Sequence, residues 1–291
     1  MAVISLNDKR TSVYKYKRTG KEKSYHSAEN FPTFASIGPA VTDGLHSHWD
    51  FGNYDSYTPS GSTVTDLTDN CHNGALENTS NISYSSDNGG HIVLTTSTIS
   101  SNYPYVRRTT DYVSSVDTGD FTIEYWVNLF HKSNSDQSGN NALIFRNLPN
   151  LTSPYDENLG IYVHDENLRG SNWLSASGPT TAGDWFYLNS AGVYDTDQYA
   201  GWEHLVFSRI GTGNLNMKLY RNSTQIHNWT NKGQFNDTQT PAANDNMSSF
   251  GADGYHGIRG KLAIYRFYLG KGLTSTEVSS NYNLEKSRFG L

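Results

Sequence analysis

Strict alternation of apolar and polar positions runs through the middle of the chain. In "DFTIEYWVNLF", residues 120–130, Phe, Ile, Tyr, Val and Leu take one set of alternate positions, and Thr, Glu, Trp and Asn take the other. A period of two predicts a strand with unlike faces. Further short runs of strand type are "GLHSHWDFG", "HIVLTT", "ALIFRN", "NLGIYVHD", "WFYLN", "WEHLVFSRI", "NMKLYRN" and "GIRGKLAIYRFYLG". Roughly a dozen short strands separated by Gly, Asn and Asp turns predict an all-β sandwich.

One segment near the C-terminus has a helical pattern instead. In "LTSTEVSSNYNLEK", Thr274 stands three residues before Glu277, which is the spacing of a capping box. Val278 and Tyr282 follow with a separation of four residues, so both would lie on one face of a helix. The sequence therefore predicts one short C-terminal helix of about two turns.

The first 43 residues are predicted to form an arm and linker ahead of a sandwich over residues 44–291. "SVYKYKRTGKEKSYHS" alternates tyrosine with lysine around "RTGK", whose glycine favours a tight hairpin turn. "NFPTFASIGPAVTDG" follows, with two prolines and two glycines, and is typical of an extended linker. Because the arm has little apolar surface, we expect it to become ordered only against a neighbouring molecule. The residues predicted to contact that partner are Tyr14, Lys15, Tyr16, Lys17 and Arg18.

Composition agrees with a β protein. Hydrophobic residues make up 35% of the chain and charged residues 17%, whereas 20 Tyr, 12 Phe and 6 Trp bring the aromatic share to 13%. Aromatic and threonine-rich sequences favour strands. The single cysteine, Cys71, excludes an intrachain disulfide, so stability must come from packing. We expect no secretory signal and no membrane partner, because no continuous apolar segment of either type is visible.

The charge is distributed unevenly. The formal net charge is −6, yet residues 1–42 hold seven basic and three acidic residues, a net charge of +4, which leaves −10 for the remainder. A basic arm on an acidic body is typical of binding to a partner. Because the acidic body would repel phosphate, we expect no nucleic-acid partner.

Five motifs occur in a familiar order between Gly44 and the C-terminus: "SYTPSGSTVTDLTDNCHNGAL", "YSSDNGGHIVL", "TTDYV" with "GDFTIEYWVN", "GWEHLVFSRI" with "MKLYRN", and "GKLAIYRFYLGKGLTSTEVSSNY". Together they resemble the concanavalin A-like, laminin-G-like (LamG-like) jelly-roll family. The matching residues in the first motif are Tyr57, Gly61, Asp66, Leu67, Asn70 and Gly74. The resemblance implies an antiparallel β-sandwich with Trp126 and Trp202 at core positions, and it does not cover the arm.

Within that family, "PSGSTVTDL", "YSSDNGG" and the "RFGL" tail resemble domains of tailed phages, where they decorate virion surfaces. The resemblance implies a non-enzymatic virion structural protein, as head decoration, fibre or tail-associated protein. It would display a lectin-like sandwich for adhesion to host or environmental glycans. Other virion proteins would bind the arm, and we expect a homo-oligomer. The alternatives are a carbohydrate-binding module of a bacterial surface protein and a glycan hydrolase of the concanavalin A-like class.

The polar stretch from Thr63 to Gly90 permits two interpretations. Asp66, Asp69 and Asn70 could hold an irregular loop by hydrogen bonds to nearby backbone. Alternatively, they could supply oxygen ligands to Ca²⁺, which some members of the family bind. Many members also carry an acidic pair just after the final Gly-Lys-Ile, and here the stretch "GKLAI" has no acid.

Other polar residues carry weaker indications of chemistry. His46 and His48 would put two imidazoles on one face of a strand, without a third ligand at a readable spacing. Cys71 and His72 are adjacent, but nothing in the sequence orients the imidazole as a base. The carboxylates predicted to lie on strands are isolated ones, as in "TIEYW" and "WEHL", so the acid pair of a glycosidase is missing.

Carbohydrate binding needs aromatic faces for the CH groups of a sugar and polar groups for its hydroxyls. The turn-rich segments "SNWLSASG", "AGDWFYLN", "QIHNWTN" and "FGADGYHG" supply both kinds of residue. Each tryptophan could equally belong to the core or to a contact between protomers. The predicted sugar-binding residues are Trp173, Trp185, Tyr187, Trp229, Asp253, Tyr255 and His256.

Overall fold

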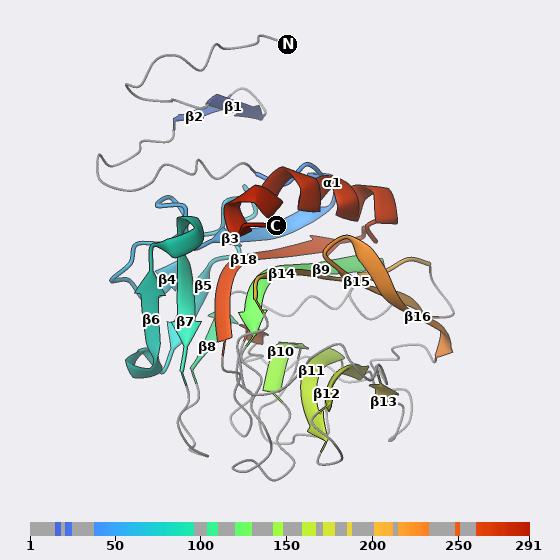
Figure 1. Ribbon diagram of the computed structural model, residues 1–291. Coiled ribbons are helices and arrows are strands. Elements are labelled where there is room, and N and C mark those ends of the chain that lie inside the picture. The colour runs from blue at the N-terminus through green and yellow to red at the C-terminus, as the bar shows by residue number, and fades with distance from the viewer. Residues whose placement is uncertain are drawn as a thin grey trace.

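The structure is a computed structural model of the 291-residue chain. It describes residues 38–95, 104–109, 120–129, 201–211, 215–232 and 260–291, together with strands at 15–18, 21–24, 142–147, 159–166, 171–177, 185–187 and 248–250. Most of the described elements are strands, which form two large antiparallel sheets packed face to face (Figure 1). The predicted all-β sandwich is confirmed.

The first sheet has the order β16-β15-β14-β9-β18-β7-β6, and β3 also pairs with β18. β7 pairs with the start of β18, at Gly260–Leu262, and β3 pairs with its later part, at Ile264–Tyr268. Its strands are β3 (Leu45–Asp50), β6 (Ile82–Ser85), β7 (His91–Leu94), β9 (Phe121–Leu129), β14 (Glu203–Arg209), β15 (Leu215–Arg221), β16 (Thr224–Lys232) and β18 (Gly260–Leu269).

The second sheet has the order β13-β12-β11-β10-β17-β8-β5-β4. Two short strands of this sheet, β4 and β5, come from the polar stretch that the sequence interpreted as a loop. Its strands are β4 (Thr63–Val64), β5 (Gly74–Glu77), β8 (Tyr105–Arg108), β10 (Ala142–Asn147), β11 (Leu159–Glu166), β12 (Ser171–Ser177), β13 (Trp185–Tyr187) and β17 (Ser248–Phe250).

The main core lies between the two sheets. β9 contributes the apolar set that its alternation predicted, and β5, β8 and β17 contribute Leu76, Val106 and Phe250 from the opposite sheet. Because residues two apart in a strand share a face, one alternating sequence is sufficient to build this layer. The β9 residues in the core are Phe121, Ile123, Tyr125, Val127 and Leu129.

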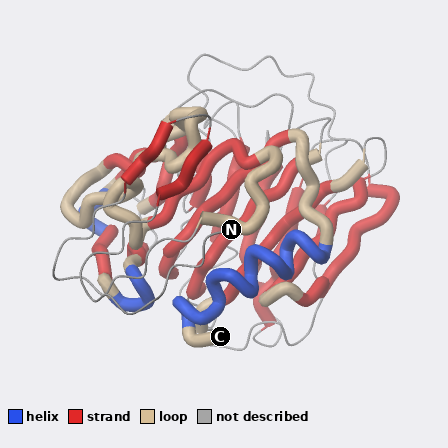
Figure 2. The backbone as a smooth tube through the Cα atoms, turned by 90° about the horizontal axis from the view of Figure 1, so that it is seen from above, coloured by secondary structure: helices blue, strands red, loops and turns tan. Residues whose placement is uncertain are grey.

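A helix covers the other face of the first sheet. α1 (Ser275–Glu285) lies across the outer face of β3, β9 and β18, as Figures 1 and 2 show from two directions. Its N-terminus has the predicted capping box: the Thr274 hydroxyl accepts the Glu277 N–H, and Glu277 accepts the Thr274 N–H. The helix has eleven residues, about three turns rather than the two expected. A 3₁₀ turn, η4 (Lys286–Phe289), continues the chain.

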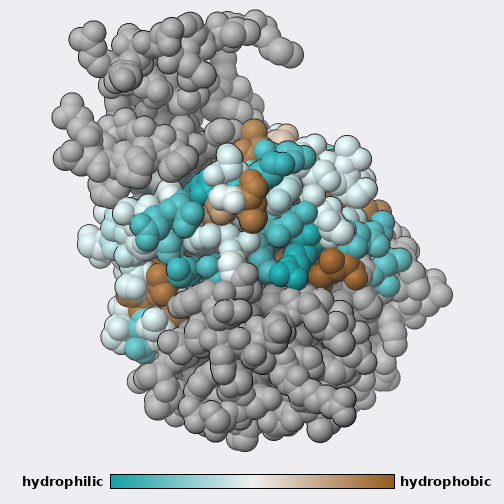
Figure 3. Space-filling view, viewed as in Figure 1, coloured by the Kyte–Doolittle hydropathy of each residue, from teal (hydrophilic) through white to brown (hydrophobic). Residues whose placement is uncertain are grey.

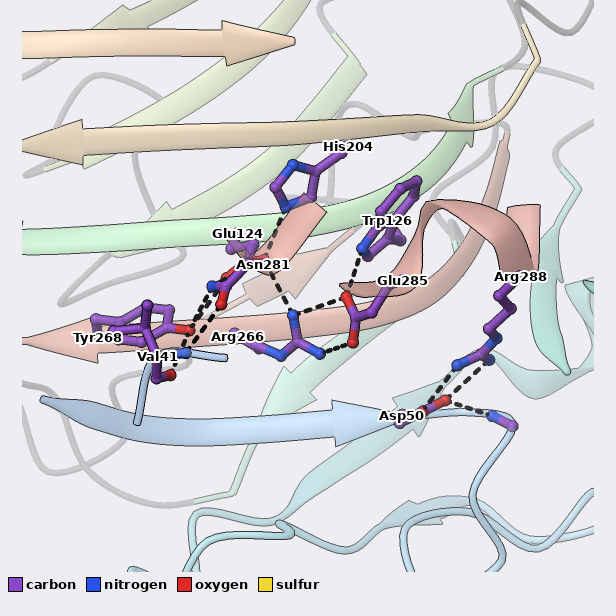
Figure 4. Close-up of polar contacts among 11 residues, drawn as sticks. Val41, Asp50, Glu124, Trp126, His204, Arg266, Tyr268, Asn281, Glu285 and Arg288 are labelled. Atoms are coloured by element: carbon purple, nitrogen blue, oxygen red, sulfur yellow. Dashed lines mark hydrogen bonds and ion pairs between the residues drawn. The ribbon is translucent and has the colours of Figure 1, made fainter. Parts of the chain in front are cut away.

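Beneath α1 the polar face of β9 is buried, with Glu124 at its centre (Figure 4). Arg266 Nη1 of β18 donates to Glu124 Oε1 and to Glu285 Oε2 of α1, each at 3.0 Å. Asn281 Nδ2 donates to Glu124 Oε2 at 2.9 Å, and His204 Nε2 of β14 lies 2.7 Å from Glu124 Oε1. Helix and sheet are therefore joined by charged hydrogen bonds as well as by apolar packing.

Charge pairing overcomes the cost of burying these groups. Burial alone would raise the pKa of Glu124, but the charge of Arg266 and the hydrogen bond from His204 bring that pKa down to about 2. Burial also opposes the charge on Arg266, yet Glu285 and Glu124 raise the pKa of its guanidinium above the ordinary value. Both groups are thus held in their charged forms. Trp126 joins the same network, because its Nε1–H donates a hydrogen bond to Glu285 Oε2 at 2.7 Å.

The C-terminal turn closes over two loops of the sandwich. Arg288 makes a two-pronged ion pair with Asp50 at 2.9 and 3.0 Å, and its Nε donates to the Asn88 carbonyl at 2.8 Å. Gly52 is required beside it, because a Cβ there would stand 1.7 Å from the Gly89 carbonyl oxygen. This turn therefore fastens the end of the chain to the loops that follow β3 and β6.

The predicted N-terminal hairpin is confirmed, as β1 (Lys15–Arg18) and β2 (Lys21–Ser24) pair antiparallel. Val41, which the sequence assigned to the arm, is held by the sandwich: its N–H donates to Asn281 Oδ1 at 3.0 Å, and its carbonyl lies 3.2 Å from the Tyr268 hydroxyl. The boundary at residue 43 stays a prediction, but Val41 is bound to the same buried network as α1.

The described surface around α1 is mainly hydrophilic, with scattered apolar residues (Figure 3). Among the described residues, the exposed large hydrophobic side chains are Tyr54 and Leu291. None of the helices that the structure describes is both long enough and apolar enough to cross a membrane.

The buried network gives the first prediction. Replacing Arg266→Met should lower the free energy of unfolding by about 3–5 kcal/mol, because it leaves two carboxylates buried without their cation. Urea denaturation followed by tryptophan fluorescence measures the change. The matched control is Lys271→Met, whose partner Glu277 lies at the surface, and it should cost less than about 1 kcal/mol. Equal losses in the two variants would show that the network does not hold α1.

Candidate functional site

Three of the predicted sugar-binding residues lie on neighbouring strands at one edge of the second sheet. Trp173 is in β12, and Trp185 and Tyr187 are in β13, the edge strand. The predicted strand in "WFYLN" is confirmed as β13, whereas "SNWLSASG", which the sequence indicated only as turn-rich, is extended as β12. Asp253, Tyr255 and His256 lie outside the described residues.

The strand register brings these three residues to one face of the sheet. Tyr187 pairs with Ser175, and Trp185 pairs with Ser177. Directly paired residues share a face, as do residues two apart in one strand, so Trp173 shares the face of both. The intervening positions carry the apolar residues Leu174, Ala176 and Phe186.

A row of paired positions identifies this face as the outer one. Arg107 of β8 is paired with Ser248, which is paired with Arg146. The row continues through the pairs Arg146–Gly160, Gly160–Ser177 and Ser177–Trp185. Arg107 bonds Glu77 at the surface, and the two side chains are 33% and 31% exposed. Its neighbour Val106 belongs to the core. Trp173, Trp185 and Tyr187 therefore occupy outer-face positions.

β11 adds two ring-bearing residues to this face. His164 is paired with Trp173, and Tyr162 is paired with Ser175. Five aromatic or imidazole positions thus lie on the same face as the small residues Ser175, Ser177 and Gly160. We call this set of eight positions the aromatic face: Gly160, Tyr162, His164, Trp173, Ser175, Ser177, Trp185 and Tyr187.

Trp229 does not belong to the aromatic face. It lies in β16 of the first sheet and pairs with Met217, a residue of the core between the sheets. Since paired residues share a face, Trp229 is at an inner-face position. Its position fits the alternative that the sequence left open, a core residue.

Asp66, one of the predicted calcium ligands, is buried and holds its loop by hydrogen bonds. Its Oδ1 accepts the N–H groups of His48 and Thr68 at 2.9 and 3.0 Å. Its Oδ2 accepts the Thr68 hydroxyl at 2.6 Å and the His72 N–H at 2.9 Å. Four donors from the chain itself therefore occupy this carboxylate, and Asn73 Oδ1 accepts the Asp66 N–H as well.

The other two predicted ligands do not complete a calcium site with Asp66. Asp69 is exposed, and Asn70 uses its amide nitrogen to donate to the carbonyls of Leu45 and His46. Within the described ranges, no group of three or more His, Cys, Asp or Glu residues is arranged to hold a metal ion. The described contacts fit the structural interpretation of this loop, and they do not fit an ion that takes six to eight oxygen ligands.

The expected pairing of His46 with His48 is wrong. A bulge in the β3–β18 pairing puts one extra residue between Leu45 and Ser47. The His46 ring packs on His72 at 4.0 Å and accepts from Arg108 at 3.0 Å, and burial, Arg108 and His72 lower its pKa to about 4. His48 is buried instead among the charges of the network beneath α1, and burial followed by Arg266 lowers its pKa to about 3.

The isolated carboxylates of the strands are buried too. Glu124 is the centre of the network beneath α1, and Glu203 forms an ion pair with Arg221. Cys71 is exposed in a left-handed conformation with φ of 59°, and its sulfur lies 3.8 Å from the Asp69 carbonyl. Of the two tryptophans expected in the core, Trp126 is fully buried, whereas Trp202 is half-buried and donates to Asn88.

The predicted partner-binding residues of the arm fall on β1, except Tyr14, which lies outside the described residues. The register pairs Tyr16 with Lys23 and Arg18 with Lys21 on one face, and it pairs Lys17 with Glu22 on the other. Cations thus occupy positions on both faces of the hairpin. Whether they bind a partner stays a prediction.

Sequence comparisons identify no relative. No protein-family model matches the chain, and no curated protein matches it either.

Solved structures, by contrast, share its architecture. Domain 4 of AbnA, a GH43 extracellular arabinanase from Geobacillus stearothermophilus solved with arabinotriose, aligns with a TM-score of 0.51 at 21% identity, over 81% of this chain and 96% of that domain. The binding domain of botulinum neurotoxin DC, solved with rat synaptotagmin II, aligns with a TM-score of 0.54 at 14% identity, over 83% of this chain. The serotype G binding domain gives 0.55 at 16%, over 84% of this chain.

These alignments establish the fold: a jelly-roll β-sandwich of the kind found in those carbohydrate- and receptor-binding domains. The chain spans about half the length of the neurotoxin binding domains, 51% in both cases. At such low identity the likeness concerns architecture alone.

Sequence reasoning missed three residues of the outer face. Tyr162 and His164 lie in "NLGIYVHD", where they alternate with Ile161 and Val163. That alternation was a usable signal of a strand with one apolar face. Arg146, in "ALIFRN", could not have been placed, because Ser248, the partner that links it to the row from Arg107, comes from a strand far away in the sequence.

The loop contacts give the second prediction. Asp66→Ala should lower the free energy of unfolding by about 2–4 kcal/mol, because it leaves buried N–H groups without an acceptor. The control Asp69→Ala, at an exposed position, should change stability by less than about 0.5 kcal/mol. Thermal denaturation with and without EDTA should give one melting temperature for the wild type. A fall in that temperature on adding EDTA, together with equal effects of the two variants, would favour the calcium interpretation.

Proposed function

We propose that the chain is a non-enzymatic glycan-binding protein whose aromatic face holds the sugar. The observation that carries the proposal is the register, which brings Trp173, Trp185 and Tyr187 from two strands to one outer face. Aromatic rings offer flat apolar surfaces to the CH groups of sugars, while serine and histidine can hydrogen-bond hydroxyls. The aromatic face combines both kinds of residue at adjacent positions.

The structural neighbours support the same proposal. The AbnA domain was solved with arabinotriose. Another structure of this fold comes from botulinum neurotoxin type C, whose cell entry depends on interaction with two ganglioside molecules. A jelly roll is therefore a scaffold on which glycan sites occur. Which ligand binds depends on the residues of the site rather than on the scaffold.

The proposal that the chain is not an enzyme rests on its acids. Glycoside hydrolysis by the common route needs two carboxylates facing the scissile bond. Glu124 and Glu203 are buried, and each is engaged with an arginine. Neither is at a position on the aromatic face. The described strand positions next to that face add one carboxylate, Glu166, whereas the common route needs two, which supports binding without cleavage.

We place this binding module on the surface of a tailed-phage virion, as head decoration, fibre or tail-associated protein and as a homo-oligomer. The basic hairpin supports an anchoring role, because it combines unpaired strand edges with positive charge. Gold-labelled antibody against the sandwich should decorate intact particles, and a chain lacking residues 1–37 should not sediment with them. Full-length chain that never sediments with particles would contradict the virion setting while leaving glycan binding open.

Glycan binding itself is tested with the labelled full-length chain on a glycan array. Trp173→Ala and Trp185→Ala should each weaken binding to the array hits by about tenfold or more, which corresponds to about 1.4 kcal/mol. Prolonged incubation with a hit glycan should release no new reducing ends. Isothermal titration of one soluble hit gives the dissociation constants.

The matched control is Tyr54→Ala, an exposed aromatic residue in the loop after β3. It should bind glycans like the wild type. An array without hits, or equal losses in the Tyr54 and Trp173 variants, would defeat the proposal. Released reducing ends would defeat its non-enzymatic part.

A further inference from the structure

One cation shares a row with the aromatic face. Arg146 of β10 is paired with Gly160, and Gly160 is paired with Ser177, which is paired with Trp185. The two positions between Arg146 and Trp185 thus carry a hydrogen and a hydroxymethyl group. No bulky residue stands in this row between the guanidinium-bearing position and the indole-bearing position.

The partners of Arg146 in the register carry no charge. On one side it is paired with Ser248 and on the other with Gly160. Arg107, farther along the same row, differs because it already bonds Glu77 with N–O distances of 2.7 and 2.9 Å. In this row, Arg107 is therefore ion-paired with an acid, whereas neither residue paired with Arg146 is acidic.

Charged residues of opposite sign stand at the two ends of the aromatic face. At the opposite end of β11 stands Glu166, which is paired with Ser171, two positions beyond His164 and Trp173. The aromatic residues thus lie between a positive position at the Gly160 end and a negative position at the other. An elongated ligand with one anionic end would be oriented by these two charges.

We infer that the ligand of the aromatic face is an oligosaccharide bearing an acidic sugar, whose carboxylate binds Arg146 while its other units lie on the rings. This inference rests on the proposed glycan-binding function and deepens it. A guanidinium matches a carboxylate with two parallel hydrogen bonds, which gives it specificity for that group over a neutral hydroxyl.

Strand geometry requires a ligand of more than one unit. Three strand spacings separate β10 from β13, so Arg146 and Trp185 are about 14 Å apart at the backbone. Trp173 lies four positions along β12 from Ser177, the residue paired with Trp185, which adds about 13 Å along the strand direction. A single sugar cannot span these backbone positions, whereas an oligosaccharide can.

The experiment uses the full-length chain on an array that holds sialylated glycans, uronic-acid oligosaccharides and their neutral counterparts. The hits should carry carboxylates, and removing the acidic group should weaken binding by tenfold or more. Sialyllactose against lactose, and trigalacturonic acid against its carboxyl-reduced form, distinguish the two sources of the carboxylate in solution titrations. Raising the salt concentration should weaken only the acidic probes.

Variants assign the effect to one residue. Arg146→Gln should abolish the preference for acidic over neutral probes. Its affinity for neutral probes, which depends on Trp173, should stay at the wild-type level. Arg146→Lys should recover part of the preference, because it restores the charge without the fork. Arg107→Gln is the matched control on the same row and should keep the full preference. Circular dichroism confirms that each variant is folded.

The outcomes separate this inference from the proposed function. Neutral hits of equal affinity, or an Arg146→Gln variant that keeps the acidic preference, would overturn the inference and leave glycan binding intact. An array without any hit would defeat glycan binding itself, and the inference with it.

Discussion

Cross-strand register is the constraint on which the rest of this structure depends. Side chains alternate along each strand, so the pairing of neighbours decides which residues gather on each face. In the second sheet, one uninterrupted row of pairs runs from Arg107 to Trp185. The same register that sends Val106 into the core puts the positions of Tyr162, His164, Trp173, Trp185 and Tyr187 on the opposite face. A slip of one residue would exchange the two sets.

The first sheet uses its outer face differently. There α1 covers the polar positions of β9, and Glu124 and Arg266 are buried as a charged pair with Glu285. This third layer also binds Val41, so the segment leading from the arm is held by the same hydrogen bonds as the helix. One sheet is therefore devoted on both faces to stability. The proposed function uses the outer-face positions of the other sheet, which carry aromatic and small polar residues.

Local pattern was sufficient to predict much of this architecture. The alternation in β9, the capping box at Thr274 and the pairing of β1 with β2 follow from signals within a few residues, and the structure confirms all three. What could not be predicted depends on distant pairing. A bulge at His46 puts this residue and His48 on different faces, and no local feature of "LHSHWD" predicts the bulge.

The polar set of β9 is a second case. Its alternation predicted two unlike faces, but only the packing of a helix from the far end of the chain shows that the polar face is buried. The candidate site follows the same rule. Composition could nominate Trp173 and Trp229 equally. Trp229 is at an inner position because it pairs with Met217 of the core, and Trp173 is at an outer position because the row from Arg107 reaches its face. The register of a whole sheet depends on how all its strands pair, so the sequence of a single segment gives little information about it.

The most direct test of the central claim is thiol accessibility along β12, in a chain whose own exposed cysteine has been replaced by Cys71→Ser. Ser175→Cys and Ser177→Cys, at outer-face positions, should react with a maleimide in the native protein nearly as fast as in urea. Ala176→Cys, between them on the inner face, should be protected until the chain unfolds. Rapid labelling at position 176 with protection at 175 and 177 would reverse the two faces and contradict the account.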